Sequence, residues 1–160
     1  MVTHHSAAPP HSKLMNREKR AMSSHTPTAS SAVSHPTILT WRIASAILLL
    51  IMGGIHVYLV FNGVGGLLGA LFVLNGIGAL ALAIAIIVLR GRLLLLATVL
   101  GLLFMAGTLL ALVLALTVGL FGIHEVLSFT LVPATLVIES IGTIVLAVTL
   151  TLMWRSRAGT

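Results

Sequence analysis

Three polar side chains interrupt long apolar stretches of the sequence, and they are its best candidates for chemistry. They are His56, Asn75 and Glu139. A histidine and a glutamate can take up and release a proton, and an asparagine can both donate and accept hydrogen bonds. A charged group at the centre of a bilayer costs about 2.5 to 3.5 kcal/mol on insertion scales, so such residues commonly mark proton or substrate paths. What they can do depends on the elements that hold them.

The stretches around these residues are long enough and apolar enough to cross a membrane. Of the 160 residues, 58% are hydrophobic and only 8% are charged, whereas a soluble domain carries about a quarter charged residues. No Asp, Glu, Lys or Arg occurs in residues 43–89 or in residues 93–124. Charge-free runs of roughly 18 or more apolar residues predict membrane-spanning helices. The expected fold class is therefore an all-α integral membrane protein.

Short turn signals, "NGVGG" and "RGR", divide the apolar region into helices. Four are expected, at residues 43–61, 67–89, 93–118 and 131–154. Because loops this short make consecutive helices antiparallel, the sequence predicts an up-down four-helix transmembrane bundle over residues 41–157. Residues 1–40 are rich in Ser, Thr, Pro, Ala and His and lack an apolar period. They are expected to form a disordered cytoplasmic tail.

All nine basic residues fall on one side of a chain that crosses the membrane four times. They precede the first helix, lie in the turn between the second and third, and follow the fourth: Lys13, Arg17, Lys19, Arg20, Arg42, Arg90, Arg92, Arg155 and Arg157. Such a bias is typical of cytoplasmic segments, so we expect a bacterial inner membrane protein with both termini in the cytoplasm. The net charge of +6 is then a topology signal, and no nucleic-acid partner is expected.

The arginines also mark depth in the membrane. Counted along its own helix from the arginine at the basic end, His56 lies 14 residues away, Asn75 lies 15 and Glu139 lies 16. At about 1.5 Å of rise per residue, all three sit roughly 21 to 24 Å from the basic end. In a hydrocarbon core about 30 Å thick, they form one polar layer toward the outer face.

Small and polar residues recur every fourth position on two of the helices. One series is Glu139, Thr143, Ala147 and Thr151, and the other is Asn75, Ala79 and Ala83. Residues four apart share a helix face, so both series are expected to face the bundle interior. Thr143 would then join the polar layer, with Asn75 and Glu139 pointing toward each other. Glu139 would either stay neutral or pair with protonated His56.

A third series of small residues predicts a packing face without chemistry. Gly107, Ala111, Ala115 and Gly119 repeat every four residues on the third helix. Small residues let membrane helices approach closely. This face is expected to pack inside the bundle or to join two copies of the chain.

Several activities are excluded by what the chain lacks. It contains no cysteine and no aspartate, so a thiolate site or a Ser-His-Asp triad cannot be assembled. His124 and Glu125, in a stretch similar to residues 54–61, are expected at the outer surface and offer too few ligands for zinc. We therefore expect no enzyme, no metal and no resident cofactor. Were haem to bind, His56 is the one candidate axial ligand well inside the apolar region.

A four-helix membrane protein with one buried glutamate is similar to the small multidrug transporters. Their glutamate lies in the first helix and Glu139 lies in the fourth, so no residue role is carried over. Three functions stay open. The leading interpretation is a non-enzymatic inner-membrane protein, such as an accessory subunit, whose polar layer fixes helix register. The alternatives are a small dimeric proton-coupled transporter using Glu139, and a haem-, quinone- or lipid-binding membrane protein. The expected partners are the lipid bilayer and, in a homodimer or larger complex, other membrane chains.

Overall fold

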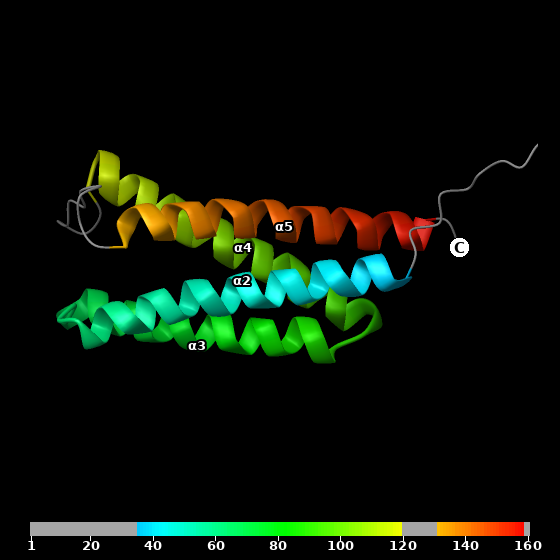
Figure 1. Ribbon diagram of the computed structural model, residues 1–160, viewed down its shortest axis with the longest axis horizontal. Helices are drawn as coiled ribbons and strands as arrows, with labels where there is room; N and C mark the ends of the chain where they lie inside the picture. Colours follow the sequence, from blue (N-terminus) through cyan, green and yellow to red (C-terminus); the bar gives the residue numbers. More distant parts are fainter. Residues whose placement is uncertain (1–34, 120–130, 159–160) are drawn as a thin grey trace, which may run out of the picture. The chain divides into compact units, whose positions relative to one another are not determined.

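Every element of the described chain is a helix. The structure, a computed structural model, describes residues 35–119 and 131–158. It contains α2 (His35–Phe61), α3 (Gly66–Val88), α4 (Gly91–Thr117) and α5 (Val132–Ala158) (Figure 1). All four are long and apolar enough to cross a membrane. The predicted all-α membrane fold with four spanning helices is confirmed.

The helix ends lie within four residues of those expected, except at the start of α2. This helix begins at His35, so residues 35–40, which the sequence assigned to a disordered tail, belong to the first helix. Pro36 lies in its first turn, where the missing N–H group is least costly. Residues 1–34, the rest of the predicted tail, lie outside the described ranges.

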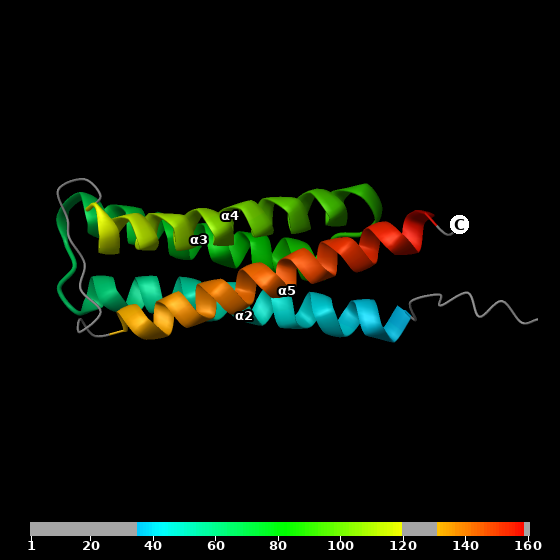
Figure 2. The same ribbon diagram turned by 90° about the horizontal axis from the view of Figure 1, so that it is seen from above.

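The helices pack in a ring in the order α2, α3, α4, α5, so that α3 and α5 lie diagonally across from each other. The most extensive contact joins α2 and α3. In Figure 1 the sequence colours run in opposite directions along α2 and α3, and again along α4 and α5. Figure 2 shows that α5 runs obliquely to α2, beside which it packs. Residues on all four helices can therefore meet at one level of the bundle.

The close approach of α2 and α3 depends on glycines, which have no side chains to separate the two helices. A Cβ atom added at Gly53 would lie 2.7 Å from the Cβ of Ala79, and one added at Gly76 would collide with Val57. Lipid tails are as apolar as leucine, so membrane helices associate through close packing rather than through the hydrophobic effect. The glycines permit that packing over the middle of the two helices.

The small residues of the predicted packing face of α4 are not all buried in the bundle. Gly107 is exposed, and a Cβ added there would have no atom within 4 Å. Gly101 faces the bundle centre instead. A Cβ added to it would lie 3.3 to 3.7 Å from side chains of the three other helices, namely Ile86, Leu146 and Leu49. Gly101 lies outside the four-residue series, and within that series Ala115 is buried.

Two arginines close the basic end of the bundle. Arg42 of α2 donates hydrogen bonds to the carbonyl oxygens of Ile86, at 2.8 and 3.1 Å, Ile87, at 2.9 Å, and Leu89, at 3.1 Å. Arg157 of α5 donates to the carbonyl oxygen of Gly91. The last carbonyls of α3 have no partner within the helix and carry partial negative charge, so the guanidinium of Arg42 stabilises them. These two arginines thus tie α2 and α5 to the α3–α4 turn.

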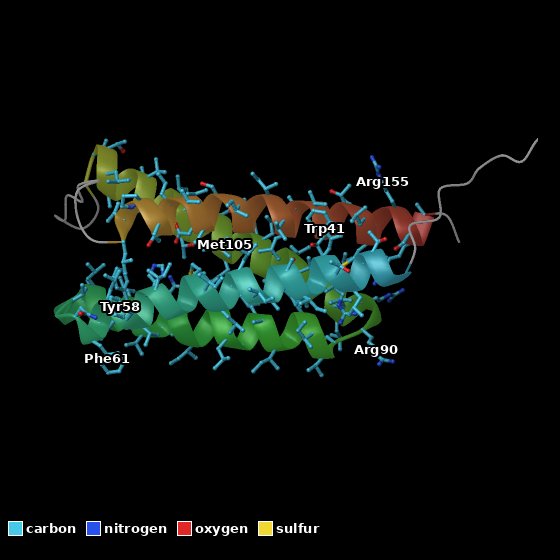
Figure 3. The ribbon with its side chains drawn as sticks, in the orientation of Figure 1. Trp41, Tyr58, Phe61, Arg90, Met105 and Arg155 are labelled. Carbon is cyan, nitrogen blue, oxygen red and sulfur yellow. The ribbon has the colours of Figure 1, made fainter. Side chains whose placement is uncertain are left out.

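The labelled side chains in Figure 3 show the two ends of the bundle. Trp41, Arg90 and Arg155 lie toward one end, and Tyr58 and Phe61 lie toward the other. Phe61 and Tyr58 are both exposed. Among the labelled side chains, those at the end opposite the arginines are therefore aromatic.

Adjacent glycines of α2 provide a matched test of the packing. Gly53→Ala should lower the free energy of unfolding by about 1 to 3 kcal/mol, because the new methyl group overlaps Ala79. Gly54→Ala should be neutral or stabilising by about 1 kcal/mol, since a Cβ at Gly54 meets nothing within 4 Å and alanine favours the helix. Denaturation in mild detergent would measure both. Equal effects of the two substitutions would contradict the close contact.

Candidate functional site

Glu139 is fully buried, and neither of its carboxyl oxygens has a hydrogen-bond partner among the described residues. It belongs to the inward face of α5, whose buried residues are spaced alternately by three and four: Thr135, Glu139, Gly142, Leu146, Thr149 and Met153. This spacing keeps one stripe of the helix toward the bundle axis. The carboxyl group is therefore held inside the bundle by the same pattern that buries its apolar neighbours.

The other buried polar residues contrast with Glu139, because each of them makes a hydrogen bond. They are Ser45, His56, Thr98, Thr135 and Thr149. Ser45 of α2 and Thr149 of α5 bond to each other at 3.0 Å, which links two helices near the basic end. Within the described chain, Glu139 is thus the one fully buried polar residue whose side chain is left without a partner.

Thr143 does not act as a partner of the Glu139 carboxyl. It is half-buried, and its hydroxyl donates to the backbone carbonyl of Glu139 at 2.8 Å. Thr151, eight residues further along, is exposed. A four-residue step turns the helix about 40° past a full turn, so the predicted series drifts away from the interior. The prediction that the whole series faces inward was wrong, and Thr149 occupies the buried face instead.

Residues of α4 lie against Glu139 and the turn that follows it. A Cβ added at Gly142 would lie 2.6 Å from Cε of Met105, so α4 and α5 are in close contact at this level. The side-chain hydroxyl of Thr108, one turn along α4, lies close enough to the Glu139 carboxyl to be a candidate donor. Its hydroxyl, however, donates to the carbonyl oxygen of Met105 at 2.9 Å. Distance and angle leave the carboxyl without a donor among the described residues.

Asn75 brings a second unpartnered oxygen into the bundle from α3. The residue is half-buried, but its Oδ1 atom is buried and has no hydrogen-bond partner in the described ranges. Gly76 contacts Val57 of α2, and Gly78 contacts Phe104 of α4. Successive residues of a helix are about 100° apart, so Asn75 lies on the face of α3 between the side that meets α2 and the side that meets α4. Its side chain therefore points into the bundle. The buried residues that follow it at four-residue spacing, Ala79 and Ala83, agree with the predicted inward face of α3.

His56 is buried, and its ring is already engaged. Its Nδ1 atom lies 2.9 Å from the carbonyl oxygen of Met52. Because a carbonyl only accepts, Nδ1 carries the proton of that bond. The ring also packs edge-on against Phe72, with centroids 4.8 Å apart. The alternative in which His56 pairs with Glu139 is not formed, since the Glu139 oxygens have no partner.

Contacts between helices bring these residues to a similar level. Glu139 lies ten residues before Thr149, and His56 lies eleven residues after Ser45, the partner of Thr149. Since α2 and α5 run in opposite directions in Figure 1, His56 and Glu139 stand within about one helical turn of each other along the bundle. The glycine contact at Gly76 likewise puts the level of Asn75 near that of His56.

Thr108 completes this layer, and sequence reasoning missed it. With His56, Asn75 and Glu139 it contributes one polar side chain from each helix. The signal was available, since Thr108 lies sixteen residues after Arg92, within the range of 14 to 16 residues that singled out the other three. A threonine was overlooked because its hydroxyl bonds readily to its own helix backbone and costs little in a membrane.

No metal centre is evident in residues 35–119 and 131–158, where three or more candidate ligands nowhere gather. The outer-surface candidates His124 and Glu125 lie outside these ranges. Four apolar spanning helices with a buried polar layer define a multi-pass α-helical membrane protein. Comparison of the chain with protein-family models, with curated proteins and with solved structures gave no match.

Two substitutions on α5 compare a buried group without a hydrogen bond, the Glu139 carboxyl, with a buried group that has one, the Thr149 hydroxyl. Glu139→Met should raise the free energy of unfolding by about 1 to 3 kcal/mol, because it removes an unsatisfied carboxyl and keeps a similar volume. Thr149→Val should lower it by about 1 kcal/mol, since it breaks the bond to Ser45. Both effects would be measured by denaturation in detergent. A loss of stability in Glu139→Met would mean that the carboxyl has a partner.

Proposed function

We propose that this protein is a non-enzymatic, proton-coupled carrier of a bacterial inner membrane, with Glu139 as the group that takes up and releases the proton. The observation that carries the proposal is the full burial of Glu139 with both carboxyl oxygens unpartnered. A buried carboxylic acid is tolerated when neutral, but a buried carboxylate requires a cation, a donor or water. Protonation of Glu139 therefore changes what the interior of the bundle can hold.

The competing interpretation, an accessory subunit whose polar layer fixes helix register, receives less support from the same atoms. A network that fixes register must bond one helix to another. Ser45 and Thr149 do this at 3.0 Å, and Arg42 does so at the end of α3. Glu139 makes no such bond in the described chain. Its retention in an apolar bundle is better explained by a task that needs an unengaged carboxyl group.

A link between proton binding and transport follows from the two charge states of that group. Protons shift a conformational equilibrium only if they bind one state better than the other. A neutral Glu139 suits the closed, dry interior, and a charged Glu139 suits a state in which a substrate or water reaches it. Alternation between these states would let one proton be exchanged for one substrate at the same carboxyl.

The orientation proposed for the carrier places both termini in the cytoplasm. The support is the position of the arginines of residues 35–119 and 131–158, which lie at the end of the bundle that holds the start of α2 and the end of α5. Excess basic residues mark cytoplasmic segments.

Single cysteines test this orientation cleanly, because the chain has none. Asn62→Cys, at an exposed position between α2 and α3, should react with a membrane-impermeant maleimide in intact cells. Ala158→Cys, exposed at the end of α5, should react only after the cells are permeabilised. The reverse pattern would refute the proposed orientation.

Transport should depend on the carboxyl group of Glu139 and not on polar groups that face lipid. Purified protein in vesicles with an imposed pH gradient would be tested against a panel of cationic, neutral and anionic solutes. We expect the wild type to accumulate at least one solute, and Glu139→Gln to reduce that uptake to the level of protein-free vesicles. Thr151→Val is the matched control, since Thr151 is exposed on the same helix and bonds only to its own backbone.

Two results would contradict the carrier function. One is gradient-driven uptake that survives in Glu139→Gln. The other is a wild-type protein that is folded in the vesicles and moves no solute of the panel.

A further inference from the structure

We propose that the end of the bundle at the α3–α4 turn binds the phosphate of an anionic phospholipid between Arg42 and Arg90. Arg42 lies fourteen residues before His56 on α2, which is about 21 Å along the helix. The site is therefore separate from the polar layer, and it does not depend on the carrier function.

Two positive charges meet at this turn. Arg42 of α2 and Arg90, which joins α3 to α4, lie close enough for their charges to repel each other. Glu139 is the one acidic residue of the described chain, and it lies sixteen residues before Arg155, or roughly 24 Å from the basic end along α5. The carbonyls at the end of α3 carry only about half a negative charge. An anion bound between the two guanidinium groups would offset their repulsion and attract both.

Both arginines retain hydrogen-bond donors for such an anion. A guanidinium carries five N–H groups. Nε and Nη2 of Arg42 donate to the last carbonyls of α3, whereas its Nη1 bonds to no group of the described residues. Arg90 is exposed, and its side chain makes no hydrogen bond within residues 35–119 and 131–158. Because the bonds to α3 hold the Arg42 guanidinium in place, binding through Nη1 costs little side-chain entropy.

A phosphate of an anionic lipid fits this pair of guanidinium groups. The N–H groups of arginine form a planar fork that matches two phosphate oxygens, and the charges strengthen each bond. A zwitterionic lipid also has a phosphate, but its ammonium group would be repelled by the second arginine. Basic pockets between membrane helices accordingly bind anionic headgroups.

The arginine pair lies at the depth where lipid phosphates are found. Phe61, at the end of α2, follows Arg42 by nineteen residues, which is about 28 Å of helix. The hydrocarbon core is about 30 Å thick, so Arg42 lies at its boundary. Trp41 adjoins Arg42, and Figure 3 shows Trp41 and Arg90 toward the same end of the bundle. Tryptophan is enriched where the hydrocarbon meets the headgroups, which supports this depth.

Apolar side chains next to the arginines favour a lipid phosphate over a free one. The end of α3 exposes Ile84, Ile87 and Val88, and Ile43 of α2 is exposed beside Arg42. A lipid whose phosphate binds the arginines can place its acyl chains on this surface, and it is already concentrated in the membrane. Inorganic phosphate makes none of these contacts and must arrive from water.

The experiment titrates the full chain in mild detergent with dioleoylphosphatidylglycerol or dioleoylphosphatidylcholine, which have the same acyl chains. Native mass spectrometry counts the lipids bound at each concentration. We expect the wild type to bind the phosphatidylglycerol at least about tenfold more tightly, which is the effect of about one hydrogen bond to a charged group.

Arg90→Gln is the decisive variant, because Arg90 makes no bond in the described chain that folding would lose. It should weaken phosphatidylglycerol binding by about tenfold and leave phosphatidylcholine binding unchanged. Arg155→Gln is the matched control. It removes the same charge from an exposed position at the same end, but Figure 3 places Arg155 at the opposite edge of the bundle from Arg90. Phosphatidylglycerol binding should be unchanged in this control.

Arg42→Gln should also weaken phosphatidylglycerol binding, because it removes the second guanidinium. This substitution breaks the bonds of Arg42 to α3 as well, so Arg90→Gln decides the question if the Arg42 variant does not fold. Inorganic phosphate added at the concentration of the lipid should displace no phosphatidylglycerol.

Four results would overturn the lipid site. They are equal binding of the two lipids to the wild type, unchanged phosphatidylglycerol binding in Arg90→Gln, an equal loss in Arg155→Gln, and displacement of the lipid by inorganic phosphate. The carrier function is judged separately, since phosphatidylglycerol binding without gradient-driven uptake would uphold the lipid site and refute the carrier.

Discussion

The close contact between α2 and α3 is the constraint on which the rest of the bundle depends. It exists because Gly53 and Gly76 have no side chains where the two helices meet, so that Ala79 and Val57 fill the space. In a bilayer this packing replaces the hydrophobic effect that would hold helices together in water. His56 follows Gly53 by less than one turn on α2, and Asn75 immediately precedes Gly76 on α3. The contact that joins the helices therefore also sets the level of two members of the polar layer.

The polar groups of the bundle fall into two kinds, and the difference is informative about function. Near the basic end, Ser45, Thr149 and Arg42 bond to groups on other helices, so they contribute to stability. In the polar layer, Glu139 and Asn75 present oxygens that nothing in the described chain satisfies. Leaving a buried acceptor unpaired costs about 1 to 3 kcal/mol. The polar groups at the basic end therefore stabilise the bundle, and the unpaired oxygens of the layer lower its stability.

Much of this fold could be predicted because membrane helices obey strong local rules. Charge-free apolar runs must be helical, since a lipid-exposed backbone can satisfy its hydrogen bonds in no other way except a closed barrel. Glycine-rich and arginine-rich turns then mark where the helices end. The start of α2 was missed because the residues before Arg42 are mostly polar and do not continue the apolar run by which the helix was recognised. The prediction that α5 turns one face inward was correct at Glu139 and wrong at Thr151. Residues spaced by four move gradually around the helix, so the end of the series no longer shares that face.

By itself the sequence determined the class of protein and the four spanning helices of the described chain, and it predicted a shared level for three polar residues, because hydrophobicity, charge and helical rise are properties of the chain alone. Only the tertiary structure decided which atoms meet. It showed that Thr108 belongs with the layer, that Thr149 rather than Thr151 faces inward, and that the carboxyl of Glu139 is left without a donor. Those outcomes depend on how the helices are rotated and how closely they approach, and contacts between helices far apart in the sequence set both.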